Sequence, residues 1–208
     1  MSTAVAAQWS ARTGLASLIL MVAMVVLAGA LTPGYSHVTQ YISELGARGA
    51  PQEMLFRLAG FTPTGVLLLA FCLFAHRALP RSRGTTLALI GLALYAAGYL
   101  VAAAFPCDLG CRPAKPSTSQ LIHNLGGGIG YLVAPACLLA LARAARDWPA
   151  AGRMVIGGHA AAALALVGLL TLEPTSPAAG LSQRLLELAV LGWSAMCGTY
   201  LARQTPKP

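Results

Sequence analysis

Acidic residues are scarce in this chain. Only 6 of its 208 residues are Asp or Glu, against 14 Lys or Arg, and charged residues make up 10% of the sequence. Soluble domains contain about 25% charged residues, so this composition excludes an ordinary soluble domain. The hydrophobic fraction is 57% and the mean hydropathy is +0.68. Together these values indicate a polytopic membrane protein.

Several signatures of catalysis and binding are also missing. The sequence has no Gly-x-Ser-x-Gly elbow, no His-Glu-x-x-His motif and no glycine-rich loop followed by Lys-Ser/Thr. The serine-hydrolase elbow, the zinc-peptidase helix and the phosphate loop are therefore excluded. The net charge of +8 comes without a basic face on a fold of its own, which excludes nucleic-acid binding. We expect no cofactor and no bound metal.

Six apolar runs are long enough to cross a bilayer, which takes roughly 20 residues in helical form. The runs are long, rich in Leu and Ala and without two-residue alternation, so they predict helices rather than strands. The sequence therefore predicts an all-α polytopic membrane protein, with residues 1–208 forming one compact bundle. The expected helices lie near residues 14–32, 53–76, 85–105, 120–143, 152–172 and 182–203.

The first run has a second interpretation. Arg12, an apolar stretch and the small residues Ala28 to Ala30 also fit a cleavable signal peptide. We expect an uncleaved first helix, because it completes an even number of spans.

The basic residues predict the orientation of the bundle. Nine of the fourteen Lys and Arg residues lie at one set of helix ends, which the positive-inside rule assigns to the cytoplasm together with both termini. The other set of connections then lies outside, and it holds five of the six acidic residues and two of the four histidines. The nine basic residues are Arg12, Arg77, Arg81, Arg83, Arg143, Arg146, Arg153, Arg203 and Lys207.

The first outer connection predicts a short helix lying in the membrane interface. Apolar residues recur at helical spacing from Tyr35 to Leu45, and a second face carries His37, Gln40 and Glu44. The apolar side would face lipid or the bundle, and the polar side a cavity. A solvated connector that lines no site is the alternative.

The second outer connection contains Cys107 and Cys111. Two cysteines this close in an oxidising compartment most simply form a disulfide, which would fix the turn that carries Asp108. A metal site that uses both thiolates and His123 is the alternative, but it lacks the second ordered ligand pair of a zinc site.

The fourth run opens with the segment Gln120 to Asn124, in which His123 lies about one turn inside the membrane and Asn124 follows it. An ionisable group at this depth normally faces the bundle interior or a water-filled cavity. Gly126 and Gly130 follow at the small-xxx-small spacing that lets helices approach closely. Such small-residue faces also allow contact with a membrane-protein partner or a second copy of the chain.

The last outer connection leads from Glu173 into Gln183, Arg184 and Glu187. Arg184 and Glu187 are three residues apart on the sixth predicted helix and can form an ion pair that lowers the cost of burial. The alternative role for Arg184 is an anion clamp for a phosphate or carboxylate headgroup. Glu53 and Arg57 form a similar candidate pair at the start of the second helix.

Several of these motifs together resemble a known family. They are Tyr-Ile-Ser-Glu-Leu-Gly at 41–46, Phe-Pro-Cys-Asp at 105–108 with a second Cys at 111, His-Asn with glycines and a Tyr at 123–131, and Gly-Leu-x-Gln-Arg at 180–184. The combination resembles the prokaryotic multi-pass membrane family called domain of unknown function 998, over about residues 15 to 200. The resemblance implies six helices in a bacterial inner membrane, and no activity that can be transferred.

A more distant similarity rests on one short motif and on the number of helices. The Ile-Ser-x-x-Gly-x-x-x-x-Pro pattern that begins at Ile42 is similar to the eukaryotic six-helix group of damage-regulated autophagy modulators and GPI-anchor lipid remodelling factors. This similarity implies a role that involves membrane lipids.

Three functions fit the sequence. The first is a pocket at the outer leaflet that binds or senses a lipid or amphiphile through Arg184, Asn124, Gln183, Ser43 and Glu173. The second is an intramembrane lipid hydrolase or transferase, with His123 or His37 as general base and Glu44 or Asp108 as its orienting partner. The third is an accessory subunit whose polar residues only tie loops together. An ion-coupled transporter would need ionisable residues near the bilayer midplane.

Overall fold

The computed structural model describes residues 1–204, so Lys207 lies outside the described part. Six segments are long and apolar enough to cross a membrane, and no strand occurs in residues 1–204. The all-helical fold class is therefore confirmed. The helices are α1 (Thr3–Ala30), α2 (Glu53–Leu55), α3 (Thr62–Ala78), α4 (Arg83–Ala104), α5 (Thr118–Ala144), α6 (Gly152–Thr171) and α7 (Ala179–Gln204).

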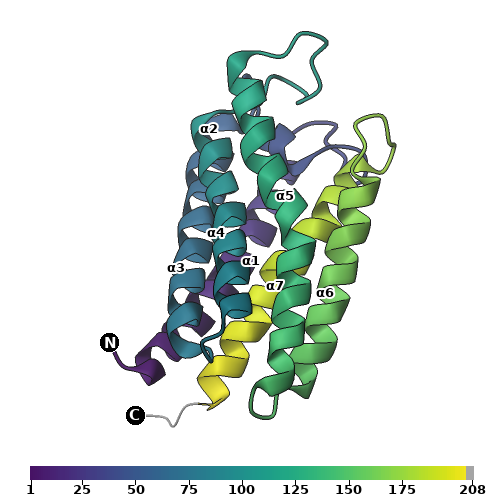
Figure 1. The fold of residues 1–208 in the computed structure, drawn as a ribbon. Coiled ribbons are helices and arrows are strands. Elements are labelled where there is room, and N and C mark those ends of the chain that lie inside the picture. Colours follow the sequence, from purple (N-terminus) through teal and green to yellow (C-terminus); the bar gives the residue numbers. More distant parts are fainter. Residues whose placement is uncertain (205–208) are drawn as a thin grey trace.

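The six spans form a closed ring. Each packs against its neighbours in the order α1, α3, α4, α5, α6, α7, and α7 returns to α1 (Figure 1). α7 also contacts α3 and α5. It is the least hydrophobic of the six spans and the most buried. The most polar span is thus the most enclosed, as expected where polar groups must avoid lipid.

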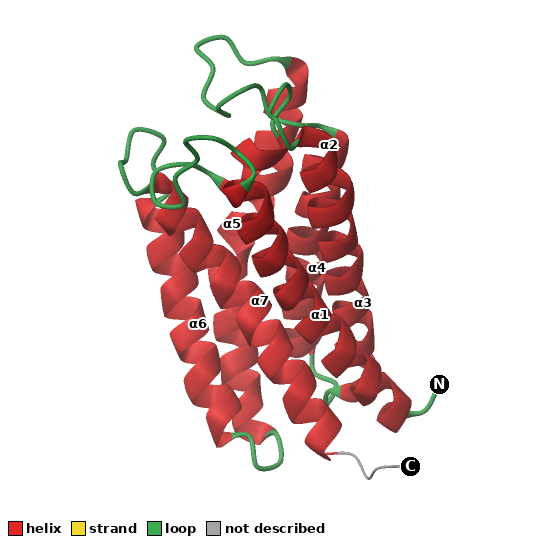
Figure 2. Cartoon of the chain, turned by 180° about the vertical axis from the view of Figure 1, so that it is seen from behind, coloured by secondary structure: helices red, strands yellow, loops and turns green. Residues whose placement is uncertain are grey.

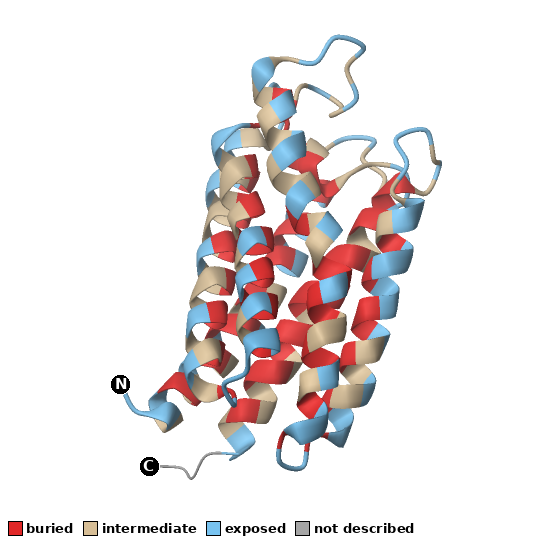
Figure 3. Ribbon diagram, in the orientation of Figure 1, coloured by how far each residue is buried: buried red, intermediate tan, exposed pale blue. Residues whose placement is uncertain are grey.

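The outward faces of the helices are apolar. Figure 3 shows buried residues facing inward on the helices and exposed residues facing outward. The exposed residues include Leu87, Ile156 and Leu170, which are 68%, 74% and 74% exposed. Large apolar side chains on the outer surface of a helix bundle are typical of contact with the hydrocarbon core of a membrane.

The three connections 31–52, 105–117 and 172–178 lie at one end of the bundle, which we call the loop end. The start of α1, the end of α7 and the connections 79–82 and 145–151 lie at the other, which we call the terminal end (Figures 1 and 2).

α1 begins eleven residues earlier than the sequence predicts, at Thr3 instead of near residue 14. The added turns carry few large apolar residues, but they pack closely against α7. A Cβ atom on Gly14 would lie 2.8 Å from the Ser194 carbonyl oxygen, and one on Gly198 would lie 2.5 Å from the Ser10 carbonyl oxygen. Contact between backbones of this kind stabilises helix pairs in lipid without large side chains.

The second span contains a wider π turn, η2 (Phe56–Phe61), between α2 and α3. The Thr62 N–H donates to the Arg57 carbonyl, and the Thr62 hydroxyl donates to the same oxygen at 2.9 Å. The Arg57 carbonyl thus takes both of its hydrogen bonds from Thr62, the residue before Pro63, which has no N–H of its own. The predicted Glu53–Arg57 ion pair is confirmed, at 2.7 Å.

The predicted interfacial helix is shorter than its spacing suggests. Only η1 (Ile42–Gly46) is helical, as a 3₁₀ turn, and most of the chain before it forms turns. Ile42 and Leu45 are 3% and 1% exposed, so the apolar side packs on the bundle and not on lipid. This segment lies over the loop end as a lid held by side-chain hydrogen bonds.

Candidate functional site

A cavity of about 520 Å³ lies at the loop end between α4, α5 and α7, and is partly open at the surface. Its floor and sides come from these helices, and its rim from the three connections. The lining residues are Tyr41, Ser43, Phe61, Tyr95, Gly98, Tyr99, Ala102, Cys111, Arg112, Pro113, Pro116, Gln120, His123, Asn124, Gly127, Gly128, Tyr131, Leu172, Pro174, Gln183 and Glu187.

The inner end of the cavity holds a buried carboxylate surrounded by tyrosine hydroxyls. Glu187 is 5% exposed. Its Oε2 accepts hydrogen bonds from Tyr95, at 2.6 Å, and from Tyr99, and its Oε1 accepts one from Tyr131 at 2.7 Å. We call these four residues the Glu187 cluster. It joins α4, α5 and α7 at a depth where only helices surround it.

Gln183 connects the Glu187 cluster to the first connection. Its Nε2 donates to the Tyr131 hydroxyl at 2.7 Å, and its Oε1 accepts from the Ile42 N–H at 2.6 Å. Each end of this buried amide therefore has a partner, as a polar group in a bundle interior requires. The side chain links the lid segment to the deepest part of the cavity.

The glycines of α5 serve two purposes. Cβ atoms on Gly126 and Gly130 would lie within 3.0 Å of Val101 and Tyr95 on α4, so these two glycines allow the close approach that their spacing predicts. Gly127 and Gly128 have nothing within 4 Å of such an atom, and both line the cavity. One face of the glycine run packs a helix, and the other leaves space.

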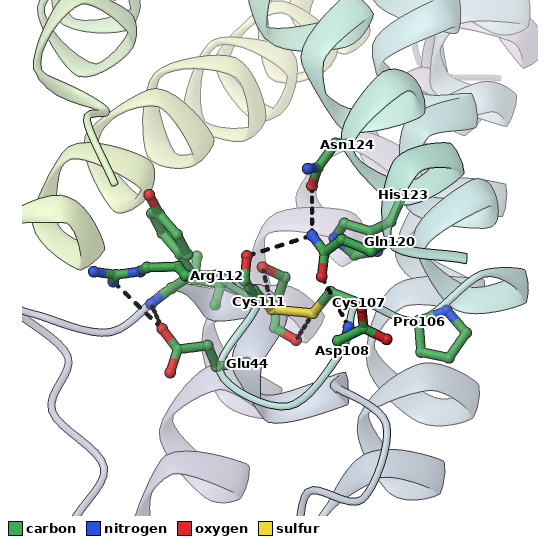
Figure 4. The surroundings of a disulfide bond; sticks show 12 residues. Glu44, Pro106, Cys107, Asp108, Cys111, Arg112, Gln120, His123 and Asn124 are labelled. Atoms are coloured by element: carbon green, nitrogen blue, oxygen red, sulfur yellow. Dashed lines mark hydrogen bonds and ion pairs between the residues drawn. A yellow bond between two sulfur atoms is a disulfide. The ribbon is translucent and has the colours of Figure 1, made fainter. Parts of the chain in front are cut away.

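The second connection folds around the disulfide between Cys107 and Cys111 (Figure 4). Gln120, 1% exposed, accepts from the Asp108 N–H at 2.8 Å and donates to the Cys111 carbonyl and the Asn124 side chain. A single amide of α5 thus holds the disulfide loop at the cavity rim. Because both thiols are oxidised, the alternative metal site on these cysteines is wrong.

Asp108 caps the start of α5. Its carboxylate accepts from the Ser117 N–H at 2.9 Å and from the Ser117 hydroxyl at 2.7 Å. These hydrogen bonds favour the ionised form and hold the pKa of Asp108 below its ordinary value. The contacts are those of a helix cap, and Asp108 is not among the residues that line the cavity.

Arg112 joins the three connections at the rim. Its guanidinium donates to the carbonyl oxygens of Thr39 and Pro174 at 2.9 and 2.5 Å, lies 3.5 Å from the Glu44 carboxylate and covers the ring of Tyr41. Figure 4 shows Arg112 and Glu44 facing each other beside the disulfide. Burial of the Tyr41 ring raises the pKa of its hydroxyl. Arg112 therefore links loop to loop.

Arg184 does not pair with Glu187, and that prediction is wrong. Its guanidinium donates to the carbonyl oxygens of Gln40 and Gly180, both at 2.9 Å, to the Tyr35 hydroxyl at 2.6 Å and to His37 Nδ1 at 3.0 Å. Within residues 1–204 neither ion pair involves Arg184. Arg184 anchors the first connection to α7, because the tertiary structure supplies four acceptors on that side.

His37 is the outermost member of this anchor. Its ring meets that of Tyr35 edge to face, with centroids 5.2 Å apart. Burial, and secondly the nearby positive charge of Arg184, hold the pKa of His37 below its ordinary value. The neutral ring is the form whose Nδ1 can accept a hydrogen bond from Arg184.

Four of the nine residues proposed for catalysis or substrate binding line the cavity: His123, Asn124, Gln183 and Ser43. The other five do not line it: Glu44, Asp108, His37, Arg184 and Glu173. The first four have the contacts described above, and Glu173 accepts a hydrogen bond from the Thr175 hydroxyl. His123 Nδ1 lies 3.0 Å from the Phe105 carbonyl oxygen, and no histidine forms an ion pair with a carboxylate within residues 1–204. In the same range no three His, Cys, Asp or Glu side chains could hold a metal ion.

The three tyrosines were not predicted as site residues, and Glu187 was predicted to pair with Arg184 instead of with them. One signal was available: Tyr95 and Tyr99 are four residues apart in an apolar run, so their hydroxyls lie on one face of a helix. A second was Glu187 itself, a carboxylate well inside the last span. The hydrogen bonds between the tyrosines and Glu187 could not be predicted from spacing, because the three tyrosines belong to two other helices.

The chain belongs to the family described as protein of unknown function (DUF998), whose model matches residues 15–200. The match covers most of the chain and all six spans. No curated protein and no solved structure matches it. The chain is therefore a six-helix, multi-pass membrane protein of this family, and the distant eukaryotic similarity stays a prediction.

Proposed function

We propose that this protein binds or senses a lipid or other amphiphile in the cavity at the loop end. The observation that carries the proposal is the cavity itself. Its volume of about 520 Å³ is that of a small-molecule site, roughly 300–1,000 Å³. Most of the exposed surface of its lining is apolar, and polar side chains lie at the rim and at the inner end, a combination typical of ligand pockets.

The polar groups inside the cavity are placed to fix a ligand's orientation. Asn124, His123 and Ser43 lie toward the rim, and Gln183 and Glu187 toward the inner end. Between them Gly127 and Gly128 contribute no side chains and leave open space beside them, so a flexible chain or headgroup has room along α5. An amphiphile matches this pattern because it carries both kinds of surface.

The proposed setting is the outer leaflet of a bacterial inner membrane. Basic residues gather at the terminal end, where Arg77, Arg81, Arg143, Arg146 and Arg203 lie, and the positive-inside rule assigns that end to the cytoplasm. The loop end and its disulfide then face the oxidising side, which agrees with the chemistry of Cys107 and Cys111.

A lipid-modifying enzyme is less well supported. General acid–base catalysis by a His–carboxylate pair needs the two groups within hydrogen-bond reach. His123 contacts a backbone carbonyl instead, and Glu44 and Asp108 are held by loop residues. The cavity therefore favours binding over hydrolysis.

The proposal can be tested by blocking the cavity. In Gly128→Leu the new side chain projects into open space within the cavity and fills part of it. The matched control is Gly192→Leu on α7, where a Cβ atom also meets nothing within 4 Å but which does not line the cavity. Lipids retained by each purified full-length protein are counted and identified by native mass spectrometry.

We expect the unmodified protein and Gly192→Leu to retain a bound lipid that Gly128→Leu loses. Equal retention by all three proteins would mean that the cavity is not the binding site. Absence of a retained lipid from all three after reconstitution in a mixed-lipid bilayer would favour the accessory-subunit interpretation.

A further inference from the structure

Glu187 is a buried carboxylate without a cationic partner in the described chain. No Lys, Arg or His nitrogen within residues 1–204 lies within 4.0 Å of it. The nearest basic residue along α7 is Arg184, which is bound to the first connection. An isolated carboxylate in a membrane interior is costly, and such groups mark functional sites.

The depth of Glu187 makes water a poor substitute for a partner. It lies eight residues after Ala179, the first residue of α7, or about 12 Å along the helix at 1.5 Å per residue. Helices surround it at this level, and the cavity is its route to the surface. Whatever neutralises the charge from outside must therefore enter through the cavity.

The groups around the carboxylate suit a positive charge. The tyrosine rings provide three aromatic surfaces: Tyr95 and Tyr99 lie edge to face at 88°, with centroids 5.6 Å apart, and Tyr131 is tilted 41° from Tyr95 at 5.9 Å. The faces of such rings are negative and attract ammonium groups, which proteins often bind in aromatic cages. All three tyrosines line the cavity together with Glu187, and their hydroxyls contact its carboxylate.

The same surroundings disfavour an anion. The inner end has no basic side chain, and the guanidinium of Arg112 lies at the rim, engaged with Thr39, Pro174 and Glu44. A phosphate or carboxylate placed beside Glu187 would meet like charge in a low dielectric. A neutral group would leave the carboxylate uncompensated.

We propose that the Glu187 cluster binds the ammonium group of an amine-bearing ligand, with the apolar part of the ligand lying along the open glycine face of α5. This inference rests on the proposed function, since it names the headgroup chemistry of the same cavity. The ammonium group can belong to an amphiphile or to a small free amine.

The test compares a cation with a neutral molecule of the same length. Binding of octylammonium and of octan-1-ol to the full-length protein in a non-ionic detergent is measured by titration calorimetry at neutral pH, where an alkylammonium is charged. Ethanolamine is the third probe, because it carries the amine without the alkyl chain. The variants are Glu187→Gln, which removes the charge, and Glu173→Gln, a control carboxamide outside the cavity lining.

We expect octylammonium to bind at least about 30-fold more tightly than octan-1-ol, because octan-1-ol leaves the buried charge of Glu187 unpaired. Glu187→Gln should lose that preference, because the charge of the bound ammonium group is then unpaired. Glu173→Gln retains it. Ethanolamine binding indicates a free amine as ligand, and its failure to bind while octylammonium binds indicates an amphiphile. Should Glu187→Gln fail to fold, the preference of the unmodified protein and its loss in Gly128→Leu decide the question.

Equal binding of the two eight-carbon probes to the unmodified protein would overturn the inference and leave the lipid-binding proposal intact. Unchanged octylammonium binding by folded Glu187→Gln would overturn it as well. If neither probe binds and Gly128→Leu retains the same lipids as the unmodified protein, both proposals fail.

Discussion

Arg184 and Glu187 lie within one turn of each other on α7, and they serve different parts of the molecule. Arg184 has four acceptors from the first connection and from its own helix, and none of them lies inside the cavity. Glu187 has three hydroxyl donors, all from other helices and all lining the cavity. One side of α7 therefore holds the lid segment in place, and the adjacent side forms the floor of the cavity.

Mutations on the two sides of α7 should therefore affect different properties of the protein. Residues on the lid-fastening side should matter mainly for stability. Residues on the cavity side should matter mainly for binding, because functional sites keep groups that folding alone does not require.

The largest expected effect is at Gly180, on the lid-fastening side. A Cβ atom there would lie 2.2 Å from the Gln40 carbonyl oxygen, which is backbone and cannot rotate away. We expect Gly180→Ala to lower the free energy of unfolding by about 3 kcal/mol, as overpacking of a tight contact does. Thermal unfolding of the purified protein in detergent measures the change.

Gly128→Ala is the matched substitution on the cavity side. Its new methyl group meets open space, so the higher helix propensity of Ala should stabilise the protein by up to about 1 kcal/mol. Equal losses of stability at both positions would contradict the contrast between the lid contact of Gly180 on α7 and the open cavity lining at Gly128 on α5.

A smaller loss is expected for Arg184→Ala, which removes the three hydrogen bonds that hold the first connection and one to Gly180 within α7. We expect a cost of about 2 kcal/mol, since bonds from a charged donor contribute more than neutral ones. Faster proteolysis within residues 31–46 would show where the structure loosens. Arg184→Lys keeps the charge but loses the planar fork, so an intermediate result is expected. Full stability in Arg184→Ala would mean that the lid is held by other contacts.

Glu187→Gln should change stability by no more than about 1 kcal/mol, because it removes a buried charge that forms no ion pair and keeps the shape of the side chain. Thermal unfolding at neutral pH is the measurement, with Glu187→Ala as the variant that also removes the volume. A loss as large as that of Arg184→Ala would make the Glu187 cluster a structural hub and would end the contrast between the two sides.

The smallest expected effect is a pH dependence at His37. Its pKa is held below the ordinary value by burial and by Arg184, so the unfolded chain binds more protons than the folded one as the pH falls through about 6.5. Stability should therefore decrease from about pH 7.5 to 5.5, and less so in His37→Gln. Asp108, whose pKa is also lowered, loses its contribution only below about pH 4. An identical decrease in both proteins would exclude His37 as the cause.

The positions of five spans follow closely from hydropathy, because lipid exposure requires long apolar runs. The start of α1 does not. Residues 3–13 carry Ser10, Arg12 and Thr13, which lower the apolar signal, and the helix is extended by glycine contacts between α1 and α7 that depend on both helices. The disulfide was predictable because its two cysteines are neighbours in sequence.

Parts of the site were predictable in the same local way. Spacing alone identified the glycine pair of α5 and the polar residues at its start. It failed for Arg184 and Glu187, where the three-residue spacing allowed a pair and did not require one. Local geometry states which contacts a helix permits, and competing partners from elsewhere decide which of them form.

Three features of this protein follow from the amino-acid sequence: six membrane-spanning helices, the end of the bundle at which five of its six acidic residues lie, and the loop closed by Cys107 and Cys111. They depend on hydrophobic length, charge and short-range spacing, which act within one segment. The contacts of Tyr95, Tyr99 and Tyr131 with Glu187, and of Arg184 with the first connection, depend on how the helices pack. The reason is that a buried carboxylate must take its hydrogen-bond donors from whichever helices pack against it, and that packing is fixed only when the ring of helices closes.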